Sequence, residues 1–158
     1  MRWGRGMGAS MILKDEEATE NFSMQVAGMV RSGDTILLSG PLGAGKSVFA
    51  RAFLRALCEN PSLEVPSPTY TLVQTYAAPQ GAVSHFDLWR LSGPDELEEL
   101  GWEEARDGIV LVEWPERLED LTPEDALHLT LSVQPDGSRQ VSVEGWSHRL
   151  KEAGLFVG

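Results

Sequence analysis

The segment Thr35 to Ser47, which reads TILLSGPLGAGKS, decides how this chain folds. Its apolar start, Thr35 to Leu38, is typical of a short strand that is buried on both faces. Its second part, Gly40 to Ser47, fits the pattern G-x-x-x-x-G-K-[ST], and helical periodicity follows from Lys46 to Cys58. A buried strand before this motif and a helix after it are the context of a phosphate-binding loop, so we predict such a loop here.

The residues of this loop are suited to holding the phosphates of a nucleoside triphosphate. Glycines allow successive backbone N–H groups to point inward, and the N-terminus of the following helix adds its positive dipole. Lys46 supplies a cation for the terminal phosphates, and the hydroxyl of Ser47 can ligate Mg²⁺. The nucleotide-binding residues expected from the motif are Gly40, Leu42, Gly43, Ala44, Gly45, Lys46, Ser47 and Val48.

The composition is that of an ordinary globular protein with an acidic balance. Its 158 residues are 42% hydrophobic and 23% charged, which fits one domain with a buried core. The net charge of −11 disfavours direct, tight binding to a nucleic acid. Cys58 is the single cysteine, and no apolar run reaches the roughly 18 residues of a membrane span. We therefore expect a cytoplasmic protein that does not contact a membrane.

The first ten residues differ from the rest of the chain. Residues 1–10, MRWGRGMGAS, are rich in glycine and arginine and lack the apolar stretch of a secretory signal. We expect residues 1–10 to form a disordered extension and residues 11–158 to form one P-loop domain.

Helix-like and strand-like patterns alternate along the remainder of the chain. Apolar residues recur at helical spacing over 15–30, and Pro94 lies in the first turn of a short acidic helix. After the strand over 35–38, further strands are predicted over 70–76, 83–88, 109–112, 127–133 and 139–143. Turn residues indicate that 70–76 pairs with 83–88, and 127–133 with 139–143, as antiparallel hairpins. These elements predict an α/β, P-loop NTPase-like single domain with a central mixed parallel and antiparallel sheet flanked by helices.

Two carboxylates are placed to act beside the loop. Nucleotide hydrolysis needs an acidic group to hold the metal or to orient water. Glu113 directly follows the buried strand over 109–112, and Asp87 lies in the strand over 83–88. The carboxyl ends of such strands border the ligand crevice of an α/β sheet. Each of these acidic residues could equally be a solvated residue at the end of a strand. Their positions in the sequence leave open which of the two would ligate a metal.

Four motifs in one order carry a resemblance to a known family. GPLGAGKS is followed by SPTYTLV at 67–73, HFDLWRL at 85–91 and VEWPE at 112–116. Together these motifs resemble the TsaE family, also called YjeE, over residues 11–143. The resemblance implies a P-loop ATPase that uses ATP and Mg²⁺ and serves threonylcarbamoyladenosine synthesis on tRNA.

The same resemblance implies a catalytic set. Lys46, Asp87 and Glu113 are its expected members, and Ser47, Glu113 and Asp87 are the candidates for holding Mg²⁺. Glu113 is favoured over Asp87 as the metal ligand or the group that orients water. Ser47 stands where threonine is common in the family, and it keeps the hydroxyl that a metal needs.

Further residues are implied to contact the nucleotide, each with a structural alternative. Thr69 would sense the metal or the terminal phosphate, although its hydroxyl could instead close a local turn. Trp114 would lie near the nucleotide unless it serves packing. Thr19 and Arg139 align with ATP contacts but also fit surface positions. His85 fits a structural role, since no cysteine or second histidine lies at zinc-ligand spacing.

The implied function is an accessory ATPase that hydrolyses ATP slowly on its own. It would support the proteins TsaD and TsaB in threonylcarbamoyl transfer to adenosine 37 of tRNA, without binding tRNA tightly itself. One alternative is a small-molecule P-loop kinase, whose lid normally brings cations over the phosphates, whereas segment 92–104 is acidic. A second alternative is a nucleotide-dependent switch that binds without hydrolysis and signals through the Thr69 loop.

Overall fold

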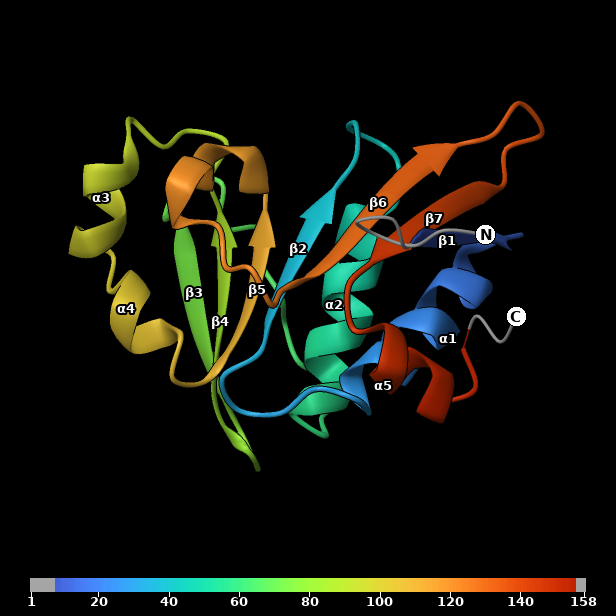
Figure 1. The fold of residues 1–158 in the computed structure, drawn as a ribbon, viewed down its shortest axis with the longest axis horizontal. Coiled ribbons are helices and arrows are strands. Elements are labelled where there is room, and N and C mark those ends of the chain that lie inside the picture. Colours follow the sequence, from blue (N-terminus) through green and yellow to red (C-terminus); the bar gives the residue numbers. More distant parts are fainter. Residues whose placement is uncertain (1–7, 156–158) are drawn as a thin grey trace.

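The chain forms one seven-stranded sheet, seen in a computed structural model that describes residues 8–155 (Figure 1). The strands are β1 Gly8–Leu13, β2 Thr35–Ser39, β3 Val73–Ala78, β4 Gly81–Asp87, β5 Ile109–Glu113, β6 Leu127–Val133 and β7 Arg139–Glu144. Their order in the sheet is β1-β7-β6-β2-β5-β4-β3. The four central strands β6, β2, β5 and β4 are parallel, and the edge strands join in antiparallel pairs.

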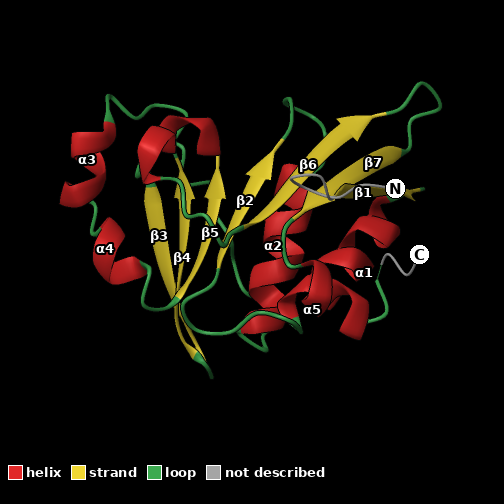
Figure 2. Cartoon of the chain, in the orientation of Figure 1, coloured by secondary structure: helices red, strands yellow, loops and turns green. Residues whose placement is uncertain are grey.

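Helices cover both faces of this sheet (Figure 2). On one face lie α1 Glu16–Ala27, α2 Lys46–Leu57 and α5 Ser147–Glu152. Asp15 caps the N-terminus of α1, and its carboxylate accepts a hydrogen bond from Ala18 N at 2.9 Å. On the other face lie α3 Pro94–Glu99, α4 Trp102–Ala105 and the 3-10 helix η1 Pro115–Leu121. Within residues 8–155 no helix is long and apolar enough to cross a membrane.

The sheet separates two hydrophobic cores. The alternation of side chains along each strand determines which core side the acidic residues face. Val83 and Leu111 point into the core beneath α1 and α2, whereas Phe86 points into the core beneath α3 and η1. Successive side chains of a strand point to opposite faces. Asp87 and Glu113 therefore point to the same side as Val83 and Leu111, which is the side of α2.

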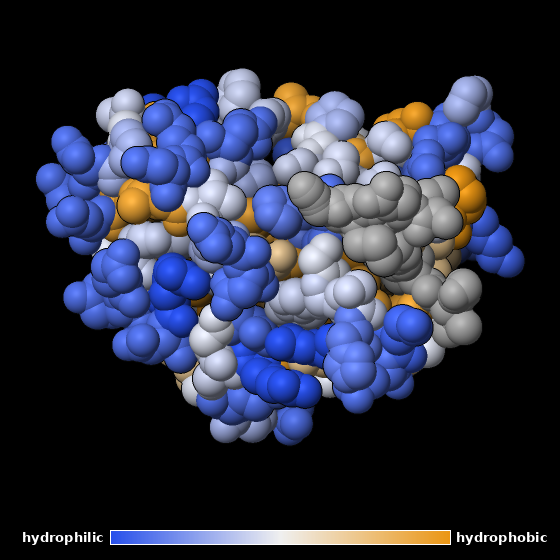
Figure 3. Space-filling view, viewed as in Figure 1, coloured by the Kyte–Doolittle hydropathy of each residue, from blue (hydrophilic) through white to orange (hydrophobic). Residues whose placement is uncertain are grey.

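The surface over α3 and α4 is predominantly hydrophilic (Figure 3). Each of these two short helices buries one side chain, Leu97 in α3 and Trp102 in α4. Their first turns carry the acidic residues Asp95, Glu96, Glu103 and Glu104. Acidic side chains at a helix N-terminus interact favourably with the positive end of its dipole.

The predicted fold class is confirmed, including both antiparallel hairpins, β3 with β4 and β6 with β7. The first strand of the first hairpin starts later than the pattern over 70–76 predicts, at Val73. Leu72 N donates to Pro68 O at 2.6 Å, and Leu72 has a φ of +70°. The residues before Val73 therefore form a turn that carries Thr69, not a strand.

The expectation of a disordered extension over residues 1–10 is wrong for residues 8–10. These residues open β1 and pair with β7, with Ser10 opposite Ser142. Gly8, Ala9 and Ser10 have low strand propensity, but pairing with the free edge of β7 overrides that preference. Residues 1–7 lie outside the described part of the chain.

Candidate functional site

The loop between β2 and α2 has a backbone that only glycine tolerates at key positions. Gly40 has a φ of +147°, and a Cβ added there would lie 2.6 Å from the carbonyl oxygen of Leu131. Gly45 has a φ of +106° and caps α2, which then starts at Lys46. The conformational freedom of glycine thus lets the chain turn from the end of a buried strand directly into a helix N-terminus.

A side chain from the far end of the sequence holds this loop in place. Arg139, at the start of β7, donates from Nε to Ala44 O at 3.1 Å and from Nη2 to Gly43 O at 3.1 Å. Its third donor, Nη1, bonds to Gly137 O in the β6–β7 turn. These bonds tie two carbonyls of the loop to the guanidinium.

A cavity of about 440 Å³ lies between the loop and the carboxyl ends of β4 and β5. Lys46 reaches into it, and its Nζ atom is 4.1 Å from the centroid of the Trp114 ring. This ammonium is buried and has no hydrogen-bond partner among the described residues. The other residues that line the cavity are Leu42, Gly43, Gly45, Ser47, Val48, Ser67, Thr69, Asp87, Trp89, Glu113, Trp114 and Arg139.

The two carboxylates in the cavity have different partners. Glu113 accepts a hydrogen bond at Oε2 from His85 Nε2, at 2.7 Å. Asp87 uses both of its oxygens, since Oδ2 accepts from Thr69 Oγ1 at 3.1 Å and Oδ1 accepts from Trp89 N at 3.0 Å. Within residues 8–155, Glu113 Oε1 is thus the carboxylate oxygen of the pair that no protein donor occupies.

The structure brings together most of the residues predicted for the site. Gly40 and Ala44 are part of the loop but do not line the cavity. Thr19 is buried in α1 and lines a smaller adjoining hollow of about 90 Å³, together with Gly45, Val48 and Arg139. The functional roles assigned to these residues remain predictions.

Two lining residues were not predicted as site residues. Ser67 shares a 2.7 Å hydrogen bond with Thr69, and Trp89 packs against Trp114 with ring centroids 4.5 Å apart. Their positions could have been inferred from sequence, because Ser67 opens the motif that contains Thr69 and Trp89 lies two residues after Asp87.

A metal held entirely by protein side chains does not fit this cavity. The described residues contain no group of three or more His, Cys, Asp and Glu that could hold an ion. Mg²⁺ usually takes only one or two protein oxygen ligands when phosphates and waters complete its shell. Ser47 and the free oxygen of Glu113 match that smaller requirement.

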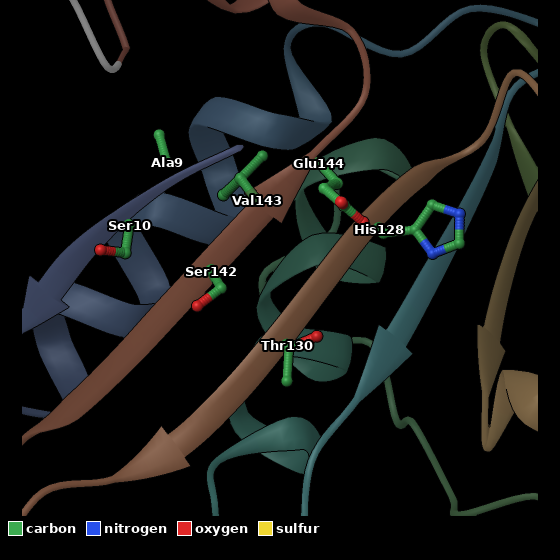
Figure 4. A pocket seen from close by; sticks show the side chains of 7 residues that line it. All are labelled: Ala9, Ser10, His128, Thr130, Ser142, Val143 and Glu144. Carbon is green, nitrogen blue, oxygen red and sulfur yellow. The ribbon is translucent and has the colours of Figure 1, made fainter. Parts of the chain in front are cut away.

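A second hollow, of about 360 Å³, lies on the outer face of β1, β7 and β6 (Figure 4). The side chains of Ser10, Thr130 and Ser142 face into it, with α1 and α2 on the opposite side of the sheet. The described residues that line it include neither glycine-loop amides nor a lysine, which are the groups that bind a phosphate chain.

The fold and the site together define an α/β protein of the P-loop NTPase-like class. The family model described as "Threonylcarbamoyl adenosine biosynthesis protein TsaE" matches residues 13–141. The chain belongs to the TsaE family, as its four motifs predicted.

Individual relatives agree with this assignment. A tRNA threonylcarbamoyladenosine biosynthesis protein TsaE from Rickettsia bellii is 37% identical over 87% of this chain and 95% of its own length. The TsaE protein from Aquifex aeolicus is 41% identical over 68% of this chain and 77% of its own length. The crystal structure of YdiB from Bacillus subtilis shares the fold, with a TM-score of 0.72 at 23% identity over 93% of this chain and 94% of that one.

Proposed function

We propose that this chain binds ATP with Mg²⁺ and hydrolyses it slowly, as a cytoplasmic accessory protein for threonylcarbamoyl transfer to adenosine 37 of tRNA. The observation that carries the proposal is Lys46 Nζ, a buried cation to which no group within residues 8–155 hydrogen-bonds, in a cavity between glycine-loop amides and Glu113. An ammonium buried in this way is costly unless a counter-charge joins it. The terminal phosphates of ATP would supply that charge.

Binding follows from the groups on the loop. The backbone N–H groups over residues 43–47 precede or begin α2, where the helix dipole favours an anion. Lys46 would leave the Trp114 ring to pair with the β- and γ-phosphates. Arg139 keeps the loop carbonyls away from the phosphates, so the amides do not need to reorganise when the ligand arrives.

The residues present fit Mg²⁺ when a nucleotide shares in holding it. Ser47 Oγ and Glu113 would be its protein ligands, and the ion would neutralise charge on the phosphates. Asp87 is the weaker candidate, because both of its oxygens already accept hydrogen bonds. We assign to Asp87 the task of holding the Thr69 loop at the edge of the cavity.

Slow hydrolysis by the chain alone is supported by the lack of a free arginine among the described residues that line the cavity. Arg139 is the one arginine among the described residues that line the cavity, and each of its three nitrogens donates to a backbone carbonyl. Partner proteins complete P-loop sites by adding such a charge. TsaD and TsaB are the partners we propose, and the net charge of −11 favours docking on proteins over holding tRNA.

The non-hydrolysing switch is the second candidate. It is favoured by one contact, the hydrogen bond from Thr69 to Asp87, which couples the loop after Pro68 to the strand end in the cavity. A metabolite kinase has less support, because no residue of the acidic helices α3 and α4 lines the cavity as a cationic lid would.

Phosphate release separates these functions. It is measured for the chain alone, with TsaD and TsaB added, and for the variant Glu113→Ala, with the exposed Glu116→Ala as matched control. We expect stimulation by the partners, loss of release in Glu113→Ala and no change in Glu116→Ala. Absence of stimulation contradicts the accessory role. Binding without turnover under all conditions favours the switch, and phosphate on an added metabolite favours the kinase.

A further inference from the structure

Among the described side chains, one holds Glu113, that of His85 on the neighbouring strand. β4 and β5 are parallel, with His85 opposite Leu111 and Asp87 opposite Glu113. His85 therefore lies on the same face as Glu113 and two residues nearer the start of its strand. From there its Nε2 atom reaches Glu113 Oε2 at 2.7 Å. The bond is shielded from water, since His85 is 2% exposed and Glu113 is 9% exposed.

The chemistry of this bond sets which ring nitrogen carries the proton. An ionised carboxylate can only accept hydrogen bonds, so His85 must donate from Nε2. In a neutral imidazole the Nδ1 atom then carries a lone pair, and this atom is buried without a partner among the described residues. A neutral imidazole in its Nε2–H form satisfies both conditions.

Packing alone does not explain a histidine at this position. Its neighbours along the same face, Val83 and Leu111, are apolar and fully buried. A buried polar atom without a partner costs free energy that an apolar side chain of similar size avoids. The benefit of His85 must therefore come from its one hydrogen bond, which fixes the rotamer of Glu113.

We propose that His85 is the positioning residue for Glu113, holding Oε2 so that Oε1 faces the cavity where nucleotide and metal bind. This inference rests on the proposed function, in which Glu113 acts on that ligand. Residues that orient a metal-binding carboxylate typically change metal affinity or activity by about 10- to 100-fold when they are removed.

Three variants test the role of His85 in turnover. His85→Leu removes the donor, His85→Gln keeps an N–H donor of similar reach, and Val83→Ala perturbs the same strand face without touching Glu113. We expect phosphate release to fall about 10- to 100-fold in His85→Leu with little change in KM for ATP, and to recover largely in His85→Gln. Equal losses in His85→Leu and Val83→Ala, or no rescue by glutamine, would overturn the proposal.

A double variant tests whether His85 affects phosphate release through Glu113. If His85 acts through Glu113, then adding His85→Leu to Glu113→Ala should cause no further loss of phosphate release. Additive losses would show that His85 acts independently of Glu113, and the proposal would be wrong.

A spectroscopic measurement tests the bond without nucleotide or metal. Two-bond ¹H–¹⁵N correlation spectra of the full chain should show His85 protonated at Nε2 and bare at Nδ1, and the Nε2 resonance should shift in Glu113→Ala. A proton on Nδ1 alone, or no response to Glu113→Ala, would contradict the proposal.

Failure of the proposed function can be told apart from failure of this inference. If the wild-type chain releases no phosphate under any condition, hydrolysis is the part that fails. The inference is then decided by ATP binding measured across a Mg²⁺ titration. His85→Leu should need at least about tenfold more Mg²⁺ than the wild type. An unchanged requirement would overturn the role of His85.

Discussion

Lys46 Nζ lies 4.1 Å from the centroid of the Trp114 ring, so the loop lysine and the tryptophan face form a cation–π contact. A cation over an indole face is stabilised by the ring quadrupole. Trp114 sits there with φ +59° and ψ +52°, a left-handed conformation that costs a bulky residue free energy. The chain thus keeps a strained residue at the end of β5, where it covers the lysine.

Nucleotide binding should therefore change tryptophan fluorescence. When Lys46 leaves the ring for phosphate, the environment of Trp114 and of Trp89, 4.5 Å away, changes. We expect the fluorescence to change when ATP and Mg²⁺ are added. Most of this change should be absent in Trp114→Phe. Trp146→Phe serves as control, because Trp146 does not line the cavity. A full response in Trp114→Phe would show that the signal does not come from Trp114 and would contradict this prediction.

Arg139→Ala should weaken ATP binding through the loop. The variant frees the carbonyls of Gly43 and Ala44, which can then turn toward the phosphates and displace the amides. We expect about tenfold weaker binding, or about 1.4 kcal/mol, by isothermal titration calorimetry. Arg139→Lys keeps the charge but not the planar fork, so it should recover little. Full recovery by lysine would instead indicate a direct charge contact with the nucleotide.

Substitutions of two loop glycines should differ in cost. An alanine Cβ at Gly40 would overlap the backbone of Leu131, whereas at Gly43, with a φ of +84°, nothing lies within 4 Å. We expect Gly40→Ala to lower the free energy of unfolding by about 2–4 kcal/mol, and Gly43→Ala by about 1–2 kcal/mol from backbone strain alone. Urea unfolding measures both. Equal costs would mean that the close approach of Gly40 to β6 is not retained in solution.

Most of the fold was predictable from local sequence patterns. The elements that were not predicted correctly depend on contacts that these patterns do not encode. The buried runs of β2 and β5 and both hairpins carry their own signals of apolar runs and turn residues. β1 does not, because Gly8, Ala9 and Ser10 form a strand only by pairing with the edge of β7. The start of β3 was misplaced because the pattern over 70–76 alternates like a strand, while the bond from Leu72 to Pro68 closes a turn.

The site was predictable where a motif names its residues. Lys46 and Ser47 follow from the loop pattern, and Glu113 follows from its place at the end of a buried strand. The contacts of Arg139 with the loop span about 95 positions of sequence and arise from where β7 joins the sheet. The bond between His85 and Glu113 likewise depends on the parallel register of β4 and β5, which no local pattern encodes.

Stability should depend on the charge of Asp136 in acid. The side-chain hydrogen bond from Ser138 and, next, the bond from its backbone N–H lower the pKa of Asp136 below its usual value of 3.8. A lowered pKa in the folded state means that the ionised form stabilises the fold above pH 3.8 and that this contribution is lost as the pH falls through the folded-state pKa.

Asp136→Asn isolates this contribution. We expect its urea midpoint to be slightly below that of the wild type at neutral pH, with a difference that shrinks as the pH falls below 3.8. The effect should be small, because Asp136 is exposed to solvent. A difference that grows in acid would contradict the assigned sign.

ATP binding by the wild-type chain and by Lys46→Ala, measured by calorimetry with and without Mg²⁺, tests the central claim most directly. The matched control is Lys14→Ala, an exposed lysine that lies outside the cavity. The account predicts that one ATP binds per chain and that it binds more tightly with Mg²⁺. The affinity for ATP should fall at least about tenfold in Lys46→Ala, or about 1.4 kcal/mol, and should not change in Lys14→Ala. Equal binding by wild type and Lys46→Ala, or no binding by either, would contradict it.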